Sequence, residues 1–323
     1  HLFLNIDLDD DVKLRDSTKK NPTATDMDRA LMAKIPSTDL VINELWLQGY
    51  RIGRVESQLL KSGEKLTLSK FNLGSGSTQL TANGDWEITP QGINKSQFSF
   101  DIQGKNSSDL MGRFAVTGGI QDASVKTKGE LRFEGAPWSM DIASLNGMLE
   151  TKIEDGYVSG VGGAGRLLGL FSLDSILRKM QLDFTGVFKD GLAFDEISGS
   201  ASITNGVVVT DNIQMKALAG DMFIKGIANL VKNQVNAEVR FIPDITSGIP
   251  VLTAFAVAPQ TALYVLAVTT VLSPVVDAFT QVRYQVTGAI DDPLVREVSR
   301  SSSEVTLPEQ ATERLRTEQQ GSK

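Results

Sequence analysis

Residues 80–102 read LTANGDWEITPQGINKSQFSFDI, and this stretch decides the fold class of the chain. From 80 to 88 every second residue is apolar or glycine, and the residues between them are polar. The alternation continues from 98 to 102, where a polar residue separates Phe98 from Phe100. Because successive side chains of a strand point to opposite faces, a period of two predicts strands with one apolar face and one hydrated face.

The same period recurs along most of the chain. It is clear at 130–134, 234–241 and 282–287. Turn signals between the runs include Lys61-Ser62-Gly63-Glu64, Asn83-Gly84, Lys189-Asp190-Gly191 and Asn205-Gly206. About a dozen short strands with turns about ten residues apart predict antiparallel neighbours joined by hairpins, rather than parallel βαβ units. The predicted fold class is mainly β.

The apolar strand faces admit two interpretations. In the first they form the closed core of a β-sandwich or solenoid, which is the commoner arrangement. In the second they form a groove that is open to an apolar ligand. Nearly all strands share the same one-sided pattern and few helices are available to cover it, which favours an open sheet.

Three short stretches are predicted to be helical inserts, namely 26–34, 108–114 and 169–180. A fourth stretch, 245–276, contains no charged residue and is interrupted by three prolines. The prolines cut it into pieces too short for a simple transmembrane span. A buried helical hairpin and helices that rest in a membrane interface remain open alternatives.

Composition excludes several function classes. The net charge is −7 and the pI is about 5.0, so no basic field is available for nucleic acid. The chain has no cysteine and its one histidine is His1, which excludes disulfides, thiolate chemistry and histidine-based sites. Residues 2–8 alternate with polar residues instead of forming a signal peptide, so we expect an excision from a longer protein. We expect no catalytic residue, no metal and no cofactor.

Two motifs require a second interpretation. Gly160, Gly162 and Gly165 match the spacing of a dinucleotide-binding loop, but the strand before them alternates with charges as a half-exposed strand does. We therefore interpret them as a glycine-rich hinge, with a nucleotide-binding enzyme as a minor alternative. The aspartates of 7–11 and 26–28 lack EF-hand spacing and are interpreted as solvated strand ends. Asp291-Asp292-Pro293 is predicted to close a strand with turn chemistry.

Several blocks resemble a known family. GRLLGLFSLDSILRKM (165–180), LDFTGVFKDGLAFDEISGSASITNGVV (182–208) and VTGAIDDPLV (286–295) resemble the C-terminal region of YhdP-type proteins in the AsmA-like family, which also includes TamB. The resemblance is strong from 157 to 295 and looser from 40 to 150. It implies a long antiparallel sheet that curls into an open groove and transfers phospholipids passively towards the outer membrane. It also implies the periplasm of a Gram-negative bacterium, within a parent protein anchored in the inner membrane.

On this resemblance the chain divides into four parts. These are a β groove over 1–244 with a helical insert near 165–180, an apolar helical segment over 245–280, a closing strand over 281–295 and a polar, disordered tail over 296–323. The residues predicted to face acyl chains are Leu45, Leu47, Leu66, Leu68, Leu80, Trp86, Ile88, Phe98, Phe100, Ile102, Leu131, Phe133, Leu182, Phe184, Val235, Val239 and Phe241. Those predicted to contact the outer membrane are Leu252, Phe255, Leu263, Tyr264, Leu266, Val271 and Leu272. The alternative function is a non-enzymatic structural or interaction module of the envelope.

Overall fold

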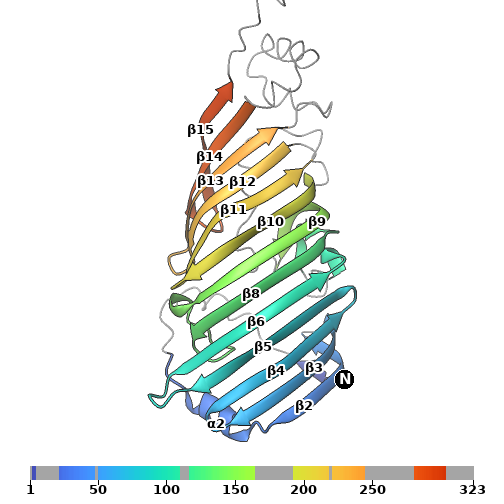
Figure 1. Ribbon diagram of the computed structural model, residues 1–323, viewed down its shortest axis with the longest axis vertical. Helices are drawn as coiled ribbons and strands as arrows, with labels where there is room; N and C mark the ends of the chain where they lie inside the picture. Colours follow the sequence, from blue (N-terminus) through green and yellow to red (C-terminus); the bar gives the residue numbers. More distant parts are fainter. Residues whose placement is uncertain are drawn as a thin grey trace, which may run out of the picture.

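The chain forms one long, open β-sheet, with its strands stacked along the long axis of the molecule (Figure 1). The computed structural model describes residues 2–4, 22–47, 50–109, 116–163, 192–217, 220–243 and 280–302. The strands are β1 Leu2–Leu4, β2 Thr38–Leu47, β3 Tyr50–Ser62, β4 Lys65–Ser75, β5 Thr78–Ile88, β6 Asn94–Gly104, β7 Val116–Gln121, β8 Ser124–Glu134, β9 Asn146–Gly163, β10 Leu192–Thr204, β11 Val207–Ala217, β12 Gly220–Asn229, β13 Gln234–Pro243, β14 Thr280–Ala289 and β15 Pro293–Ser302. The helices are α2 Asp26–Lys34 and the 3-10 turn η1 Ile142–Ser144.

Strand order follows chain order almost throughout. Neighbours from β2 to β15 pair antiparallel, as the sequence predicts, and only the short β1 pairs parallel, with β2. The long strand β9 is the one branch point: β8 pairs with its first half and β7 with its last residues along the same edge. The predicted fold class, a mainly β protein with an open antiparallel sheet, is therefore confirmed.

The strand registers sort the side chains onto two faces. We call the side that carries the large apolar residues the apolar face and the opposite side the polar face. Directly paired residues share a face, and one row on the apolar face crosses the sheet from β4 to β13. Its members are Leu68, Gly84, Phe98, Leu131, Gly147, Ile203, Val208, Ala228 and Val235.

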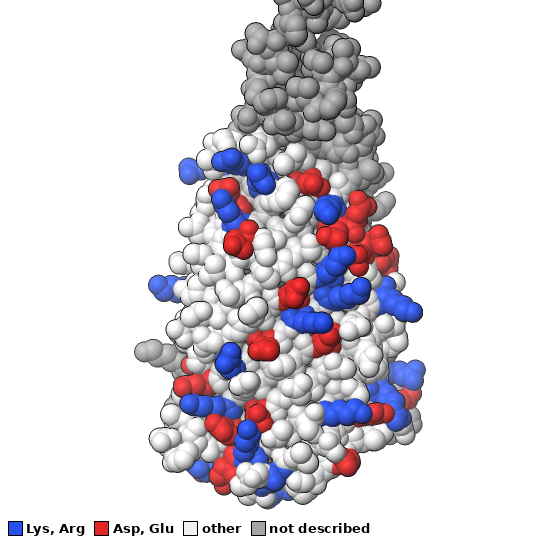
Figure 2. Space-filling model, in the orientation of Figure 1, with Lys and Arg blue, Asp and Glu red and all other residues white. Residues whose placement is uncertain are grey.

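The polar face carries charges of both signs over most of its area (Figure 2). At its centre the Lys152 ammonium lies 2.6 Å from a Glu154 carboxylate oxygen and 3.3 Å from one of Glu196. The hydrogen bond to Glu154 and then that to Glu196 raise the pKa of Lys152. Because such pairs are solvent-exposed, they favour solubility and strand register more than stability.

Helix α2 covers one end of strands β5 and β6 on the apolar face. Thr25 caps it: the Thr25 side chain accepts from the Asp28 amide, and the Asp28 carboxylate accepts from the Thr25 amide. Met32 is 1% exposed and packs in a cluster with Trp86 and Ile88. The helix therefore closes this edge of the apolar face.

A buried polar chain fastens α2 to the sheet. The Trp86 indole donates to the Asn94 side-chain oxygen at 2.9 Å, and the Asn94 amide donates to Asp28 at 2.9 Å. Burial by itself raises the pKa of Asp28, but hydrogen bonds from Thr25 and Asn94 outweigh it, so the pKa of Asp28 is lowered below its ordinary value of 3.8. Asp28 is thus held ionised where α2 meets the sheet.

Two glycine positions predicted as turns behave differently. Asn205 and Gly206 have positive φ values of 49° and 72° and form the predicted turn between β10 and β11. Asn83-Gly84, in contrast, lies inside β5, and the prediction of a turn there is wrong. Gly84 faces Phe98 across the ladder, and a Cβ at this position would collide with the Phe98 ring. The glycine serves close packing of an aromatic ring, not chain reversal.

The predicted helix at 26–34 is confirmed with the same limits. At 108–114 the described part contains a helical turn at 107–109, and 110–115 lie outside it. The predicted helix at 169–180, the segment 245–276 and residues 303–323 also lie outside the described residues. Residues 296–302, which the sequence predicts to be tail, form the last seven residues of β15, because Asp291-Asp292-Pro293 closes a hairpin that returns along β14. Among the described helices, none has the length and apolar character needed to cross a membrane.

Candidate lipid-binding face

The predicted groove residues that the structure describes lie on the apolar face. Leu45 packs beside the cluster of Ile52, Val55 and Leu73, and the others follow the rows of the sheet. Leu182, Phe184 and the side chain of Leu47 lie outside the described part, as do all the predicted membrane-contact residues from Leu252 to Leu272. The described members therefore share one face of the sheet, and their contact with lipid stays a prediction.

Half of this surface is accessible to solvent. On β4, β5, β6 and β8, which we call the open region, the predicted residues are large, and all except Trp86, Ile88 and Phe133 are only half-buried. The Phe98 and Phe133 rings lie 6.4 Å apart in a tilted arrangement, with Phe133 buried and Phe98 partly exposed. The half-buried members are Leu66, Leu68, Leu80, Phe98, Phe100, Ile102 and Leu131.

Glycines shape the open region. Gly129 lies directly opposite Phe100 on β6 and Leu149 on β9. A Cβ at Gly129 would come within 2.6 Å of the Phe100 ring and of the Leu149 side chain. The Phe100 ring and the Leu149 side chain fill the space that a side chain at this position would take, so the glycine allows them to pack closely over β8.

Two threonines interrupt the apolar row. Thr127 and Thr151 face each other across β8 and β9, and their hydroxyls lie 2.8 Å apart. One hydroxyl therefore donates to the other, which partly offsets the polarity of this half-buried position.

The other predicted groove residues are buried, and this corrects the expectation that all of them form one accessible surface. Trp86 and Ile88 lie beneath α2. Val235, Val239 and Phe241 belong to a cluster that we call the closed region, on the apolar face of β10–β14. Side chains that we did not predict complete the cluster; they include Phe194, Ile197, Met215, Met222, Val282, Tyr284 and Val286. Their period-two pattern was visible, but only the register shows that they share one surface.

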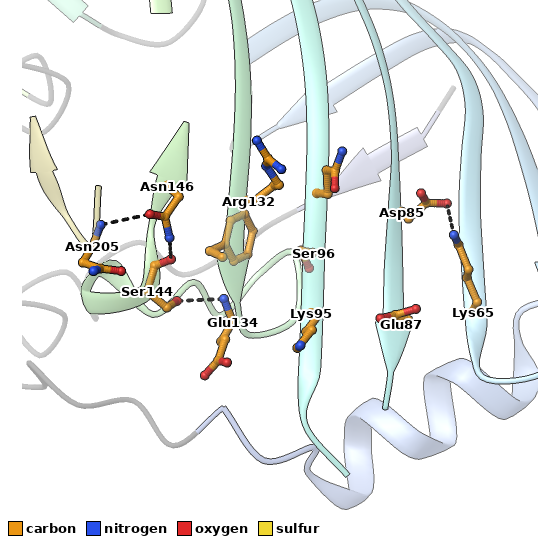
Figure 3. A pocket seen from close by; sticks show the side chains of 12 residues that line it. Lys65, Asp85, Glu87, Lys95, Ser96, Arg132, Glu134, Ser144, Asn146 and Asn205 are labelled. Atoms are coloured by element: carbon orange, nitrogen blue, oxygen red, sulfur yellow. Dashed lines mark hydrogen bonds and ion pairs between the residues drawn. The ribbon is translucent and has the colours of Figure 1, made fainter. Parts of the chain in front are cut away.

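A separate hollow of about 420 Å³ lies among polar residues at one end of the strands (Figure 3). Charged side chains line it, and Lys65 and Asp85 pair there at 3.2 Å. Asn146 accepts from the Asn205 amide and donates to the Ser144 carbonyl, which fixes the neighbouring turns to each other. Because its lining is charged, the hollow does not suit hydrocarbon.

The nucleotide-binding alternative is wrong in its structural premise. Gly160 and Gly162 lie inside β9, which is antiparallel to β7, β8 and β10. A dinucleotide loop follows a strand of a parallel sheet, where its amides reach the phosphates at a helix N-terminus. In the described ranges, no three acidic or histidine side chains come together in a way that could hold a metal.

Comparisons with known proteins place the chain in a family. Residues 1–295 match the family described as YhdP protein. The chain is 34% identical over 287 residues to the intermembrane phospholipid transporter YhdP of Escherichia coli (strain K12). The aligned residues make up 88% of this chain and 22% of that relative. The chain thus spans about a fifth of the relative's length, and no solved structure matches it. With most of its length matched by the family, the chain belongs to the YhdP protein family.

Proposed function

We propose that the chain is part of a phospholipid conduit between the inner and outer membranes of a Gram-negative envelope, and that acyl chains lie against the open region. The observation that carries the proposal is the row of large, half-buried apolar side chains on one face of a single sheet. A soluble protein rarely leaves such a surface without an apolar occupant. The relative's printed activity, intermembrane phospholipid transport, supplies the chemistry of that occupant.

The energetics suit passive transfer. Each CH₂ removed from water contributes roughly 0.8 kcal/mol, so a lipid is retained wherever apolar contact continues. Because neighbouring strands repeat similar side chains at each step, successive positions along the sheet would hold a tail with nearly equal free energy. Lipid could then move between them without a bond being made or broken, and no catalytic group is required.

The segment 245–276 is proposed to engage the outer membrane. The support is its sequence, which has 32 successive residues without charge and leaves β13 and returns to β14. Apolar pieces that prolines interrupt suit the membrane interface better than a continuous span. Leu252, Phe255, Leu263, Tyr264, Leu266, Val271 and Leu272 are the proposed contacts.

A second candidate is a structural β-module of the envelope. The closed region favours it, because Val239, Val282 and Val286 are fully buried and their side chains form an ordinary core. The open region argues against a purely structural function. Every described strand belongs to the one sheet, and no second sheet of described strands covers that region.

The test is a charge placed in the open region. Phe100→Asp is expected to lower both copurified phospholipid and lipid transfer severalfold, because a carboxylate in the path must be desolvated when a tail passes. Gln97→Glu is the matched control, since it adds one negative charge to the same strand on the polar face. Unchanged lipid content and transfer in a folded Phe100→Asp variant would refute the proposal.

A further inference from the structure

The polar face carries many ion pairs, and two arginines near its last strands lie outside those that the described residues form. Several cations of this face pair with an acid, as in Lys126–Glu154 and Lys128–Asp101. On β13 and β14, Arg240 and Arg283 are direct partners in the register. No acid of the described residues forms an ion pair with either arginine, although Lys225–Glu238 pairs nearby at 3.4 Å. Like charges directly opposite in a sheet are destabilising, so this pair needs a compensating partner.

Packing directs the Arg240 guanidinium without neutralising it. Its central carbon lies 4.4 Å from the centroid of the Phe223 ring on the adjacent strand. Stacking on a ring engages the flat face of the group and leaves its N–H donors free around the edge. Those donors form the planar fork that binds phosphate oxygens in pairs.

Another arginine and exposed apolar side chains lie on the strand next to this arginine pair. Arg296 lies on the next strand, β15, opposite Gln285. On the same strand Leu294 and Val298 are 70% and 62% exposed. Figure 2 shows basic side chains among these last strands, with acidic side chains between them. Exposed apolar residues beside arginines are typical of surfaces that enter a lipid headgroup layer.

We propose that the patch formed by Arg240, Arg283 and Arg296 docks this end of the sheet onto the phosphate groups of an anionic lipid surface. An acidic protein partner would satisfy the same charge, but it would not explain the exposed Leu294 and Val298 beside it. Arg240 and Arg283 also stand on the two strands that flank the uncharged stretch 245–276 in the sequence. This docking goes beyond lipid carriage and does not depend on it.

The test is sedimentation of the full chain with vesicles of phosphatidylglycerol mixed with phosphatidylcholine. Because a basic residue at an anionic surface contributes about fivefold in affinity, the double variant R240Q/R283Q is expected to bind about 25-fold more weakly. The matched control, K70Q/K128Q, removes the same charge from paired lysines elsewhere on the polar face and is expected to bind as the wild type does. Thermal melts of both variants check that the sheet is intact.

Binding should also fall as salt rises and be weak to pure phosphatidylcholine. Wild-type affinity in folded R240Q/R283Q, or an equal loss in the control, would overturn the proposal. So would competition by polyglutamate at concentrations that match the lipid phosphate, which would favour an acidic protein. R240Q/R283Q should keep its copurified phospholipid, because both arginines lie on the polar face, so failure of docking and failure of lipid carriage are separable.

Discussion

The open and closed regions of the apolar face share one alternation pattern but differ in what becomes of their side chains. In the open region the rows mix large residues with glycine, as in Gly84 beside Phe98 and Gly129 beside Phe100, and the rings stay half-exposed. In the closed region, methionine, valine and aromatic side chains fill successive positions and are buried against one another. The alternation of apolar and polar residues therefore identifies which face of the sheet is apolar. The sizes of neighbouring residues along a row influence whether solvent reaches that face.

The largest effect should come from the same charge placed in each region. Val239 is 0% exposed, so Val239→Asp buries a carboxylate without a partner and should destabilise the fold by about 4 kcal/mol or more. Phe100→Asp keeps part of the carboxylate in water and should cost much less. Urea denaturation followed by circular dichroism measures both, and equal losses would remove the distinction between the regions.

Truncations sharpen the comparison further. Met222→Ala in the closed region should cost about 2–5 kcal/mol, because it removes buried contacts and leaves a cavity. Leu131→Ala in the open region should cost less than half as much, since Leu131 is already partly hydrated. The two variants are compared by their urea midpoints at constant m-value. A larger loss at Leu131 would mean that the open region is packed like a core.

The attachment of α2 is the next test, because this helix closes one edge of the open region. Asp28→Asn should destabilise the protein by about 1–3 kcal/mol at neutral pH, since it weakens a buried, charge-assisted network. The folded pKa of Asp28 lies below the unfolded value, so its contribution is full above about pH 3.8 and is lost as the pH falls through the folded pKa. The melting temperatures of the wild type and of Asp28→Asn should therefore converge in acid. A difference in Tm that stays constant with pH would contradict an ionised Asp28.

The smallest effect is expected on the polar face. Lys152→Gln removes a cation with two acidic neighbours, but the group is solvent-exposed. We expect no measurable change in Tm at physiological salt. A clear loss would mean that the polar face contributes to the fold more than exposed ion pairs do.

Sequence reasoning predicted the fold well because its signal is local. The alternation at 80–88 and 234–241 needs only neighbouring residues, and both became strands with the expected faces. Asn83-Gly84 shows where local chemistry fails: the dipeptide favours a turn, but the Phe98 ring across the ladder requires a glycine in the strand. Residues 296–302 are polar and read as a tail, yet pairing with β14 makes them a strand.

The site was predicted less completely because accessibility is a property of tertiary packing. Nothing in the alternation separates Trp86, which α2 buries, from Phe100, which stays half-exposed. Met215 and Met222 were missed as members of the same surface because strand register joins them, not sequence spacing. The arginine pair was also invisible, since 42 residues separate Arg240 from Arg283 in the chain.

Photocrosslinking from single positions tests the central claim most directly. A benzophenone amino acid replaces Phe100 in the open region, Gln97 on the polar face or Val239 in the closed region, and lipid adducts are identified by mass spectrometry after irradiation in membranes. We predict phospholipid adducts at Phe100 and none above background at Gln97 or Val239. Equal labelling at Phe100 and Gln97, or no adduct at Phe100 in a folded protein, would contradict the claim that hydrocarbon occupies the open region.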